Sequence, residues 1–343
     1  MTMTQIETSV PALVPESRDP DPRPINSARD RNDRLFRAGL SSTGIAVLAI
    51  MVAVGLFLGV QAFDALRETG LGFLTTTEWE PDRGRFGIGS VLLGTVMIAF
   101  VAILVAVPIS LGTALFITNV APARFRGVLI SLVDLMAAVP SVVYGLWGLF
   151  FFQSGVIGVS RFISTWFGWV PIFSVSGAEA NSALPNATVF TASTFIAGVV
   201  VALMVMPIQC SVMREVFSQV PLGEREGALA LGATRWGAIR VVSLPFARGG
   251  IIGGTMLGLG RALGETIAVL LIISPRFDIN FRILETGGNS VSSLIALRYA
   301  EASSFSLSAL MAAGLALFAL TLVVNFIASA FVARSRSGAS SEA

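Results

Sequence analysis

The sequence predicts an all-α membrane protein with six transmembrane helices. Hydrophobic residues make up 54% of the 343-residue chain and charged residues only 13%, which is roughly half the charged fraction of a typical soluble domain. The charged residues cluster between long apolar runs. Each of six runs reaches the roughly 17–25 residues that a helix needs to cross a bilayer. Composition and run length therefore place the chain in a membrane.

The six runs follow one another between long polar ends. The predicted spans are roughly 41–63, a segment within 86–123, 128–152, 187–213, 249–273 and 307–332. Pro108, Pro140 and Pro207 lie within them and are predicted to kink their helices. The stretch 156–185 carries Trp166 and Trp169 among polar residues, and its apolar part is short for a span. We expect an interfacial helix there, because aromatic rings favour the headgroup level.

The domain organisation follows from the same pattern. Residues 1–36 are polar and rich in proline, so they are expected to form a disordered cytoplasmic tail. Residues 37–335 are expected to form the transmembrane domain, and 336–343 a C-terminal tail. Arginines concentrate in the leader, at 124–126, at 214–248 and at 334–336, which alternate with arginine-poorer loops. The positive-inside rule then predicts a multi-pass protein of the plasma or inner membrane with both termini in the cytoplasm.

The basic residues also exclude two kinds of site. All 23 of them are arginine, and the chain has no lysine, no histidine and one cysteine. A P-loop for ATP needs a lysine after its glycines, so the chain cannot bind nucleotide in that way. A structural zinc site needs several cysteine or histidine ligands, and we therefore expect no metal site.

Arg261 and Glu265 are the candidate pathway residues. They lie four residues apart within the run 249–273, so a continuous helix would place them on one face. A full charge at membrane depth is costly and usually faces a protein interior or a water-filled path. The guanidinium fork matches phosphate oxygens, and Glu265 could neutralise it when no anion is bound. The alternative is a structural salt bridge that locks this helix to a neighbour. Small residues in the same sector predict close approach of another helix: Gly250, Gly254, Gly258 and Gly264.

The loop 217–248 is predicted to contain two short helices. Glu224 and Glu226 suit a helix start, Gly232 is expected to end the first helix, and a second is expected from Thr234 to just before Pro245. An amphipathic helix on a cytoplasmic surface suits a groove on a partner protein. A solvated loop helix that binds nothing is the alternative.

This loop resembles the EAA motif of permease subunits of ABC importers, Glu-Ala-Ala-x3-Gly-x9-Ile-x-Leu-Pro. The matching positions are Glu226, Gly227, Ala228, Gly232, Val242, Leu244 and Pro245. Glycine replaces the usual alanine at 227, and valine replaces isoleucine at 242. The resemblance implies the type I importer permease architecture, in which this loop forms a cytoplasmic coupling helix that sits in a cleft of a separate ATPase subunit.

Two further stretches resemble the phosphate (Pst) importers of this class: AAVPSVVYGLWGLFFF at 137–152 and GRALGETIAV at 260–269. The second stretch, the polar leader and FLTTTEWEP at 73–81 are similar to one permease subunit of that importer more than to its partner, PstA. The resemblance implies phosphate import driven by ATP hydrolysis in other chains, with transport roles for Arg261 and Glu265. It also implies a PstA-like permease partner, two PstB-like ATPase subunits and an extracytoplasmic PstS-like phosphate-binding protein, with no cofactor and no catalytic residue in this chain.

Two alternatives remain at this point. One is an ABC permease for another oxyanion, such as molybdate or sulfate. The other is a secondary transporter or a membrane sensor that works without an ATPase.

Overall fold

The computed structural model describes residues 31–176 and 187–336. Most of the two predicted tails and the end of the stretch 156–185 lie outside these residues. Helix α1 begins at Arg31, inside the region predicted as the N-terminal tail. The described chain divides within α1 into two compact units, the first ending at Ala53 and the second beginning at Val54.

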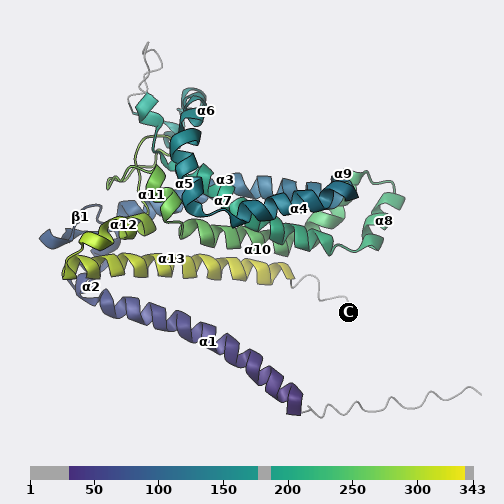
Figure 1. The fold of residues 1–343 in the computed structure, drawn as a ribbon, viewed down its shortest axis with the longest axis horizontal. Helices are drawn as coiled ribbons and strands as arrows, with labels where there is room; N and C mark the ends of the chain where they lie inside the picture. Colours follow the sequence, from purple (N-terminus) through teal and green to yellow (C-terminus); the bar gives the residue numbers. More distant parts are fainter. Residues whose placement is uncertain (1–30, 177–186, 337–343) are drawn as a thin grey trace, which may run out of the picture. The chain divides into compact units, whose positions relative to one another are not determined.

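Helices make up most of the described chain (Figure 1). They are α1 (Arg31–Gln61), α2 (Phe63–Thr69), α3 (Gly89–Leu115), α4 (Ala123–Ala138), α5 (Ser141–Trp147), α6 (Gln153–Phe167), α7 (Thr194–Ser218), α8 (Leu222–Ala230), α9 (Arg235–Ala238), α10 (Leu244–Leu263), α11 (Ile267–Ile272), α12 (Val291–Arg298) and α13 (Ser304–Arg336). A short antiparallel hairpin joins β1 (Trp79–Glu80) to β2 (Arg85–Phe86), with Trp79 opposite Phe86. The prediction of an all-α architecture is confirmed.

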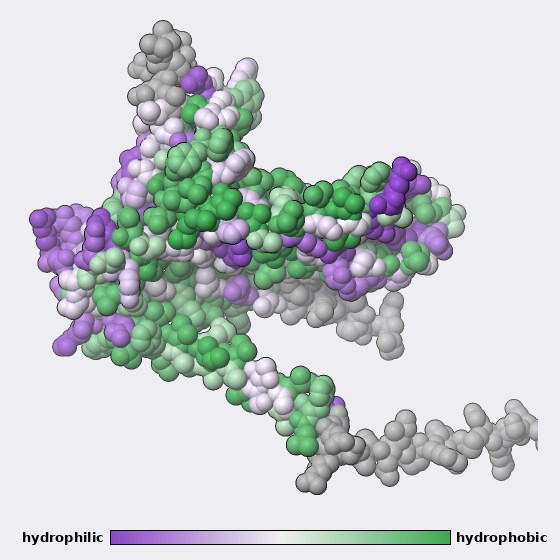
Figure 2. All heavy atoms as spheres, in the orientation of Figure 1, coloured by the Kyte–Doolittle hydropathy of each residue, from purple (hydrophilic) through white to green (hydrophobic). Residues whose placement is uncertain are grey.

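Six described helical segments are long and apolar enough to cross a membrane, as the sequence predicts. They are Leu35–Gln61, Gly89–Val120, Ser141–Phe167, Thr194–Ser218, Arg235–Leu263 and Ser304–Ala330. In the second unit, hydrophobic residues cover much of the surface along the helices, whereas hydrophilic residues gather around β1 and around α8 and α9 (Figure 2). This banding is what a bilayer with water on both sides requires.

The third predicted span is divided at Pro140. Helix α4 ends at Ala138, and Val139 and Pro140 are extended, with ψ of 128° and 141°. Proline disfavours helical backbone in the residue before it and has no N–H of its own. The helix therefore breaks at Pro140, and the helical segment that is long and apolar enough to cross a membrane runs from Ser141 to Phe167 instead of over 128–152. Residues 153–167 form α6, so a helix is present in the stretch where an interfacial helix is expected. Its place at the interface stays a prediction.

The fifth predicted span is also divided. Helix α10 ends at Leu263, residues 264–266 leave the helix, and α11 starts at Ile267. The continuous helix expected over 249–273 is therefore wrong. The break places the end of α10 and the start of α11 in different surroundings, which bears directly on Arg261 and Glu265.

Helix α7 forms the centre of the second unit and packs against α3, α4 and α10. Residues 195–208 of this helix are apolar on every side, as a buried helix requires, and Pro207 lies within it without ending it. Gly198 allows the close approach of α3, because a Cβ there would lie 2.6 Å from Cβ of Val101. Buried side chains of α3, α7 and α11 form the main core, including Ile98, Val201 and Ile272.

Beyond α11, the loop 274–290 is fastened by charges. Arg276 contacts Asp278 at 2.8 Å and Glu285 at 3.3 Å, and Arg282 contacts Glu285 at 3.2 Å. The hydrogen bond to Asp278 raises the pKa of Arg276 above its ordinary value. Backbone hydrogen bonds from Thr286 to Val189 and from Phe195 to Ile283 join this loop to the start of α7. These ion pairs and hydrogen bonds hold the loop 274–290 in place beside the start of α7.

Candidate functional site

Arg261 lies in the last turn of α10 and is exposed. It is 17 residues after Leu244, where the helix begins, which corresponds to about 26 Å along the axis. Its side chain lines a cleft of about 300 Å³ together with Ile208, Met256, Leu257, Gly260 and Asn325. Among the described residues, no carboxylate forms an ion pair with it. A charge at this depth requires water, a ligand or a neighbouring chain.

Glu265 lies beyond the end of α10 and is buried, with 9% of its surface exposed. Its Oε1 accepts a hydrogen bond of 3.1 Å from the N–H of Ala268, in the first turn of α11. The hydroxyl of Ser292 donates to its backbone carbonyl at 2.7 Å. The carboxylate thus stabilises the start of α11. The expectation that it shares a helix face with Arg261 is wrong, because the helix ends between them, and the two described side chains form no ion pair.

The glycines of α10 pack against α7, as their spacing predicts. A methyl group added at Gly250 would overlap Val216, and one at Gly258 would overlap the side-chain amide of Gln209. At Gly254 the added atom would lie 3.4 Å from Cβ of Val212. Three of the four glycines therefore form a close helix contact, and Gly264 lies past the end of the helix.

A buried polar group next to this contact is not among the predicted site residues. Gln209 is fully buried in α7, and its Oε1 lies 3.2 Å from the hydroxyl of Ser110 in α3. The same hydroxyl donates to the Met206 carbonyl at 3.0 Å. The Nε2 of Gln209 has no hydrogen-bond partner within the described chain. An amide in the middle of an apolar run is the sequence signal that would have pointed to Gln209.

The predicted coupling loop contains the exposed helix α8. Gly232 follows it with φ of +88°, a conformation that side chains disfavour, so its predicted role as helix end is confirmed. The hydroxyl of Thr234 accepts a 3.0 Å hydrogen bond from the N–H of Gly237 and begins α9, as expected. Of the other motif positions, Glu226, Gly227 and Pro245 are exposed, and Ala228 and Leu244 are half-buried.

The second loop helix does not stop before Pro245, contrary to prediction. Instead, α9 continues through a π-helical turn at 239–243 into α10, and the whole segment Arg235–Leu263 is helical. The π turn changes the spacing of the backbone hydrogen bonds just before Pro245, which has no N–H to donate. The proline is accommodated at this change of spacing, and the loop is joined rigidly to the fifth span.

Apolar side chains are exposed around α8 and α9. Leu231 is 92% exposed, and Leu222, Trp236 and Val241 are also largely accessible. Helices α8 and α9 lie at one end of α7 and α10 (Figure 1). Large apolar groups gathered on an otherwise polar end of a protein mark an interaction surface.

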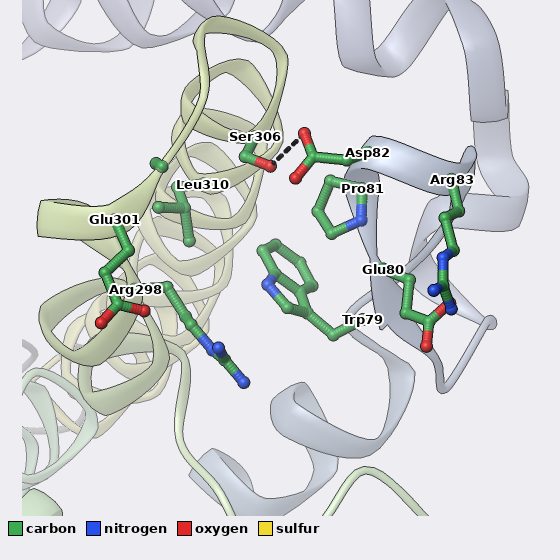
Figure 3. A pocket seen from close by; sticks show the side chains of 10 residues that line it. Trp79, Glu80, Pro81, Asp82, Arg83, Arg298, Glu301, Ser306 and Leu310 are labelled. Carbon is green, nitrogen blue, oxygen red and sulfur yellow. Dashed lines mark hydrogen bonds and ion pairs between the residues drawn. The ribbon is translucent and has the colours of Figure 1, made fainter.

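The opposite end of the second unit contains a charged pocket of about 330 Å³ between the β hairpin and the helices α12 and α13 (Figure 3). Arg83 pairs with Glu80 at 3.0 Å, and Asp82 accepts hydrogen bonds from Ser303 and Ser306. Arg298 forms no ion pair with any described residue. Figure 3 shows its guanidinium extending toward Trp79, while the carboxylate of Glu301 lies near the start of the Arg298 side chain. Asp82 and Glu301 form no ion pair with any described residue either, so the lining carries three carboxylates, two guanidinium groups and an indole ring.

Comparison with known proteins identifies the family. Residues 106–337 match the family described as binding-protein-dependent transport system inner membrane component. The chain is 38% identical over 305 residues to phosphate transport system permease protein PstC 2 of Mycobacterium tuberculosis, covering 88% of this chain and 91% of that protein. It is 38% identical over 303 residues to phosphate transport system permease protein PstC of Pasteurella multocida, with the same coverage.

The fold is similar to that of a solved transporter. A chain of a bacterial alginate ABC transporter, in complex with a periplasmic protein, matches 87% of this chain and 93% of its own length with a TM-score of 0.55 and 17% identity. At that identity the likeness concerns the fold alone. Together, the family match and the relatives above 30% identity over most of their length show that the chain belongs to the PstC family of binding-protein-dependent inner membrane permeases.

Proposed function

We propose that this chain is a membrane-spanning subunit of an ABC importer that moves inorganic phosphate into the cytoplasm. One structural observation supports this proposal in addition to the similarity to known permeases. Arg261 lies in the last turn of α10, in a cleft, without an ion-pair partner among the described residues. A guanidinium is charged at every physiological pH and matches phosphate oxygens bidentately. It is therefore suited to meet phosphate in the pathway.

The open position of Arg261 also supports a partnership with a second permease. The cleft is open at the surface of this single chain, and a permanent charge is not stable against lipid. A PstA-like subunit packed against this face would enclose the cleft and add its own groups around the anion. Glu265 contributes indirectly, because its carboxylate supports the start of α11 just beyond Arg261.

The exposed helix α8 is the proposed contact with a PstB-like ATPase subunit. Its leucines and Trp236 present apolar surface to a partner, and the continuous helix from Arg235 to Leu263 leads from this surface to Arg261. Movement of α8 on ATP binding would therefore reach the pathway through one rigid element. Transport requires that the pathway alternate between an outward-open and an inward-open state. ATP can drive this change only if the two states make different contacts with their ligands.

The pocket in Figure 3 is the proposed contact with a PstS-like binding protein outside the membrane. It lies at the end of the second unit opposite α8, and its charged side chains together with the indole of Trp79 offer polar and aromatic contacts to a partner. In this arrangement the ATPase binds at one end of the second unit and the binding protein at the other. ATP hydrolysis itself belongs to the partner chains.

Uptake of labelled phosphate tests this function. The chain is expressed with its partner subunits in cells that lack other phosphate importers. We expect ATP-dependent uptake that excess unlabelled phosphate competes away and that sulfate or molybdate leaves unchanged. Competition by sulfate or molybdate at equal concentration would favour a permease for another oxyanion. Uptake that continues without a co-purifying ATPase would favour a secondary transporter.

A further inference from the structure

A second cleft, of about 470 Å³, is lined by three arginines from three different helices. Arg126 comes from α4, Arg214 from α7 and Arg225 from α8. The cleft lies where the polar end of the second unit begins, beside the exposed helix α8. It shares no lining residue with the cleft of Arg261.

The arginines of this cleft have no ion-pair partner in the described part of the chain. Glu215 is the only carboxylate among the lining residues, and its Oε1 accepts a hydrogen bond of 3.3 Å from Gln219. Within residues 31–176 and 187–336, none of the three arginines forms an ion pair with it or with another acid. Arg126 donates to the Thr118 carbonyl at 3.2 Å, which satisfies one of its N–H groups.

Arg214 adds an observation of its own. Its Nη1 is buried and has no hydrogen-bond partner in the described part of the chain. Buried donors of charged groups are normally satisfied, and an orphan donor calls for an explanation such as a missing ligand. Nη1 itself has no surface open to the cleft, so an anion there would supply the acceptor after a small rotation of the guanidinium, whose residue lines the cleft.

The first turn of α8 strengthens the same site. Leu222, the first residue of this nine-residue helix, lines the cleft together with Arg225. The first backbone N–H groups of a helix have no partner within the helix, and its dipole favours negative charge at that end. Guanidinium groups and a helix start therefore meet at one cavity.

We propose that this cleft binds a phosphate group, either free inorganic phosphate or the phosphate of an anionic lipid headgroup. Three guanidinium groups provide planar donors that match phosphate oxygens, and basic pockets between membrane helices bind such headgroups. A bound phosphate would tie Arg225 of α8 to Arg126 of α4 and Arg214 of α7. Occupancy would therefore hold α8 against the membrane helices.

The consequence for transport rests on the proposed function. If α8 transmits ATPase motion, then an anion that fixes α8 would regulate import from the cytoplasmic side. Free phosphate would act as feedback from the delivered product, and a lipid headgroup would make activity depend on membrane composition. Binding itself is independent of the transport role.

Hydrogen exchange of residues 222–230 tests the site in the purified full chain. One arm uses nanodiscs of neutral phosphatidylcholine titrated with inorganic phosphate at constant ionic strength. The other arm titrates the fraction of phosphatidylglycerol in the nanodiscs, without phosphate. We expect slower exchange of α8 by at least about threefold in one arm, and that arm identifies the source of the phosphate group.

Variants separate the cleft from its surroundings. In the responding arm, Arg225→Gln and Arg214→Gln should each raise the titration midpoint about tenfold, because each removes a charge-assisted hydrogen bond. Arg235→Gln, an exposed arginine of α9 outside the cleft, should leave the midpoint unchanged. Arg261→Ala should also leave it unchanged, so failure of the transport site is distinguishable from failure of this site.

Two results would overturn the proposal. One is the absence of protection in both arms. The other is protection that persists in Arg225→Gln, which changes an exposed helix and should leave the fold intact. If Arg214→Gln loses the native exchange pattern of α7, Arg225→Gln alone decides the question.

Discussion

Residue 261 shows how much a single side chain can indicate. The sequence predicts a permanent cation at membrane depth, and the structure places it in a cleft without a described counter-charge. The part assigned to Glu265 could not be predicted in the same way. The apolar run 249–273 predicts one continuous helix, whereas α10 ends at Leu263. Because the helix ends there, the carboxylate of Glu265 can accept a hydrogen bond from the N–H of Ala268.

Gly258 provides a test at the residue scale. Gly258→Ala would push a methyl group into the buried amide of Gln209, and overpacking of this kind costs about 1–3 kcal/mol. We expect a lower thermal unfolding temperature in detergent. Gly253→Ala is the matched control, because no atom lies within 4 Å of its added Cβ and alanine has the higher helix propensity. Equal unfolding temperatures for the two variants would contradict the packing described for α10 and α7.

At the scale of elements, the existence of the helices follows from the sequence and several of their ends do not. Length and hydropathy suffice for six spans, because the bilayer fixes both. Pro140 is predicted to kink a helix, yet the chain leaves the helix at Val139 and Pro140 and divides the third predicted span into α4 and a second helical segment. Pro245 was predicted to end a helix, yet a π turn accommodates it. In both cases the local backbone around proline, which hydropathy does not encode, decides the outcome.

Within the coupling loop, the sequence predicts the end of α8 and the start of α9 correctly, although not the continuation of α9 into α10. Gly232 was expected to end α8 and has the positive φ that favours glycine. The EAA motif usually has alanine at the position of Gly227. A Cβ added at Gly227 would have no atom within 4 Å, so packing does not require glycine there. The role of α8 in docking stays a prediction, since it depends on a partner chain.

For the whole molecule, orientation in the membrane is the prediction that arginine placement supports and that labelling can check. Cys210 is fully buried, so a new exposed cysteine should be the main reactive thiol. A membrane-impermeant maleimide should label Arg83→Cys in intact cells and Glu224→Cys only after the membrane is disrupted. The reverse pattern would place both termini outside and would contradict the proposed import direction. Unsubstituted protein controls for labelling of Cys210.

The transport account depends most directly on Arg261, and uptake by Arg261→Ala is its sharpest test. The variant is compared with Arg161→Ala, an exposed arginine of α6 outside the cleft, and co-purification of the ATPase is measured in both. Loss of several charge-assisted hydrogen bonds should reduce phosphate uptake by about 100-fold or more, while the complex still assembles and Arg161→Ala transports normally. Normal uptake by a fully assembled Arg261→Ala complex would contradict the claim that phosphate passes this side chain.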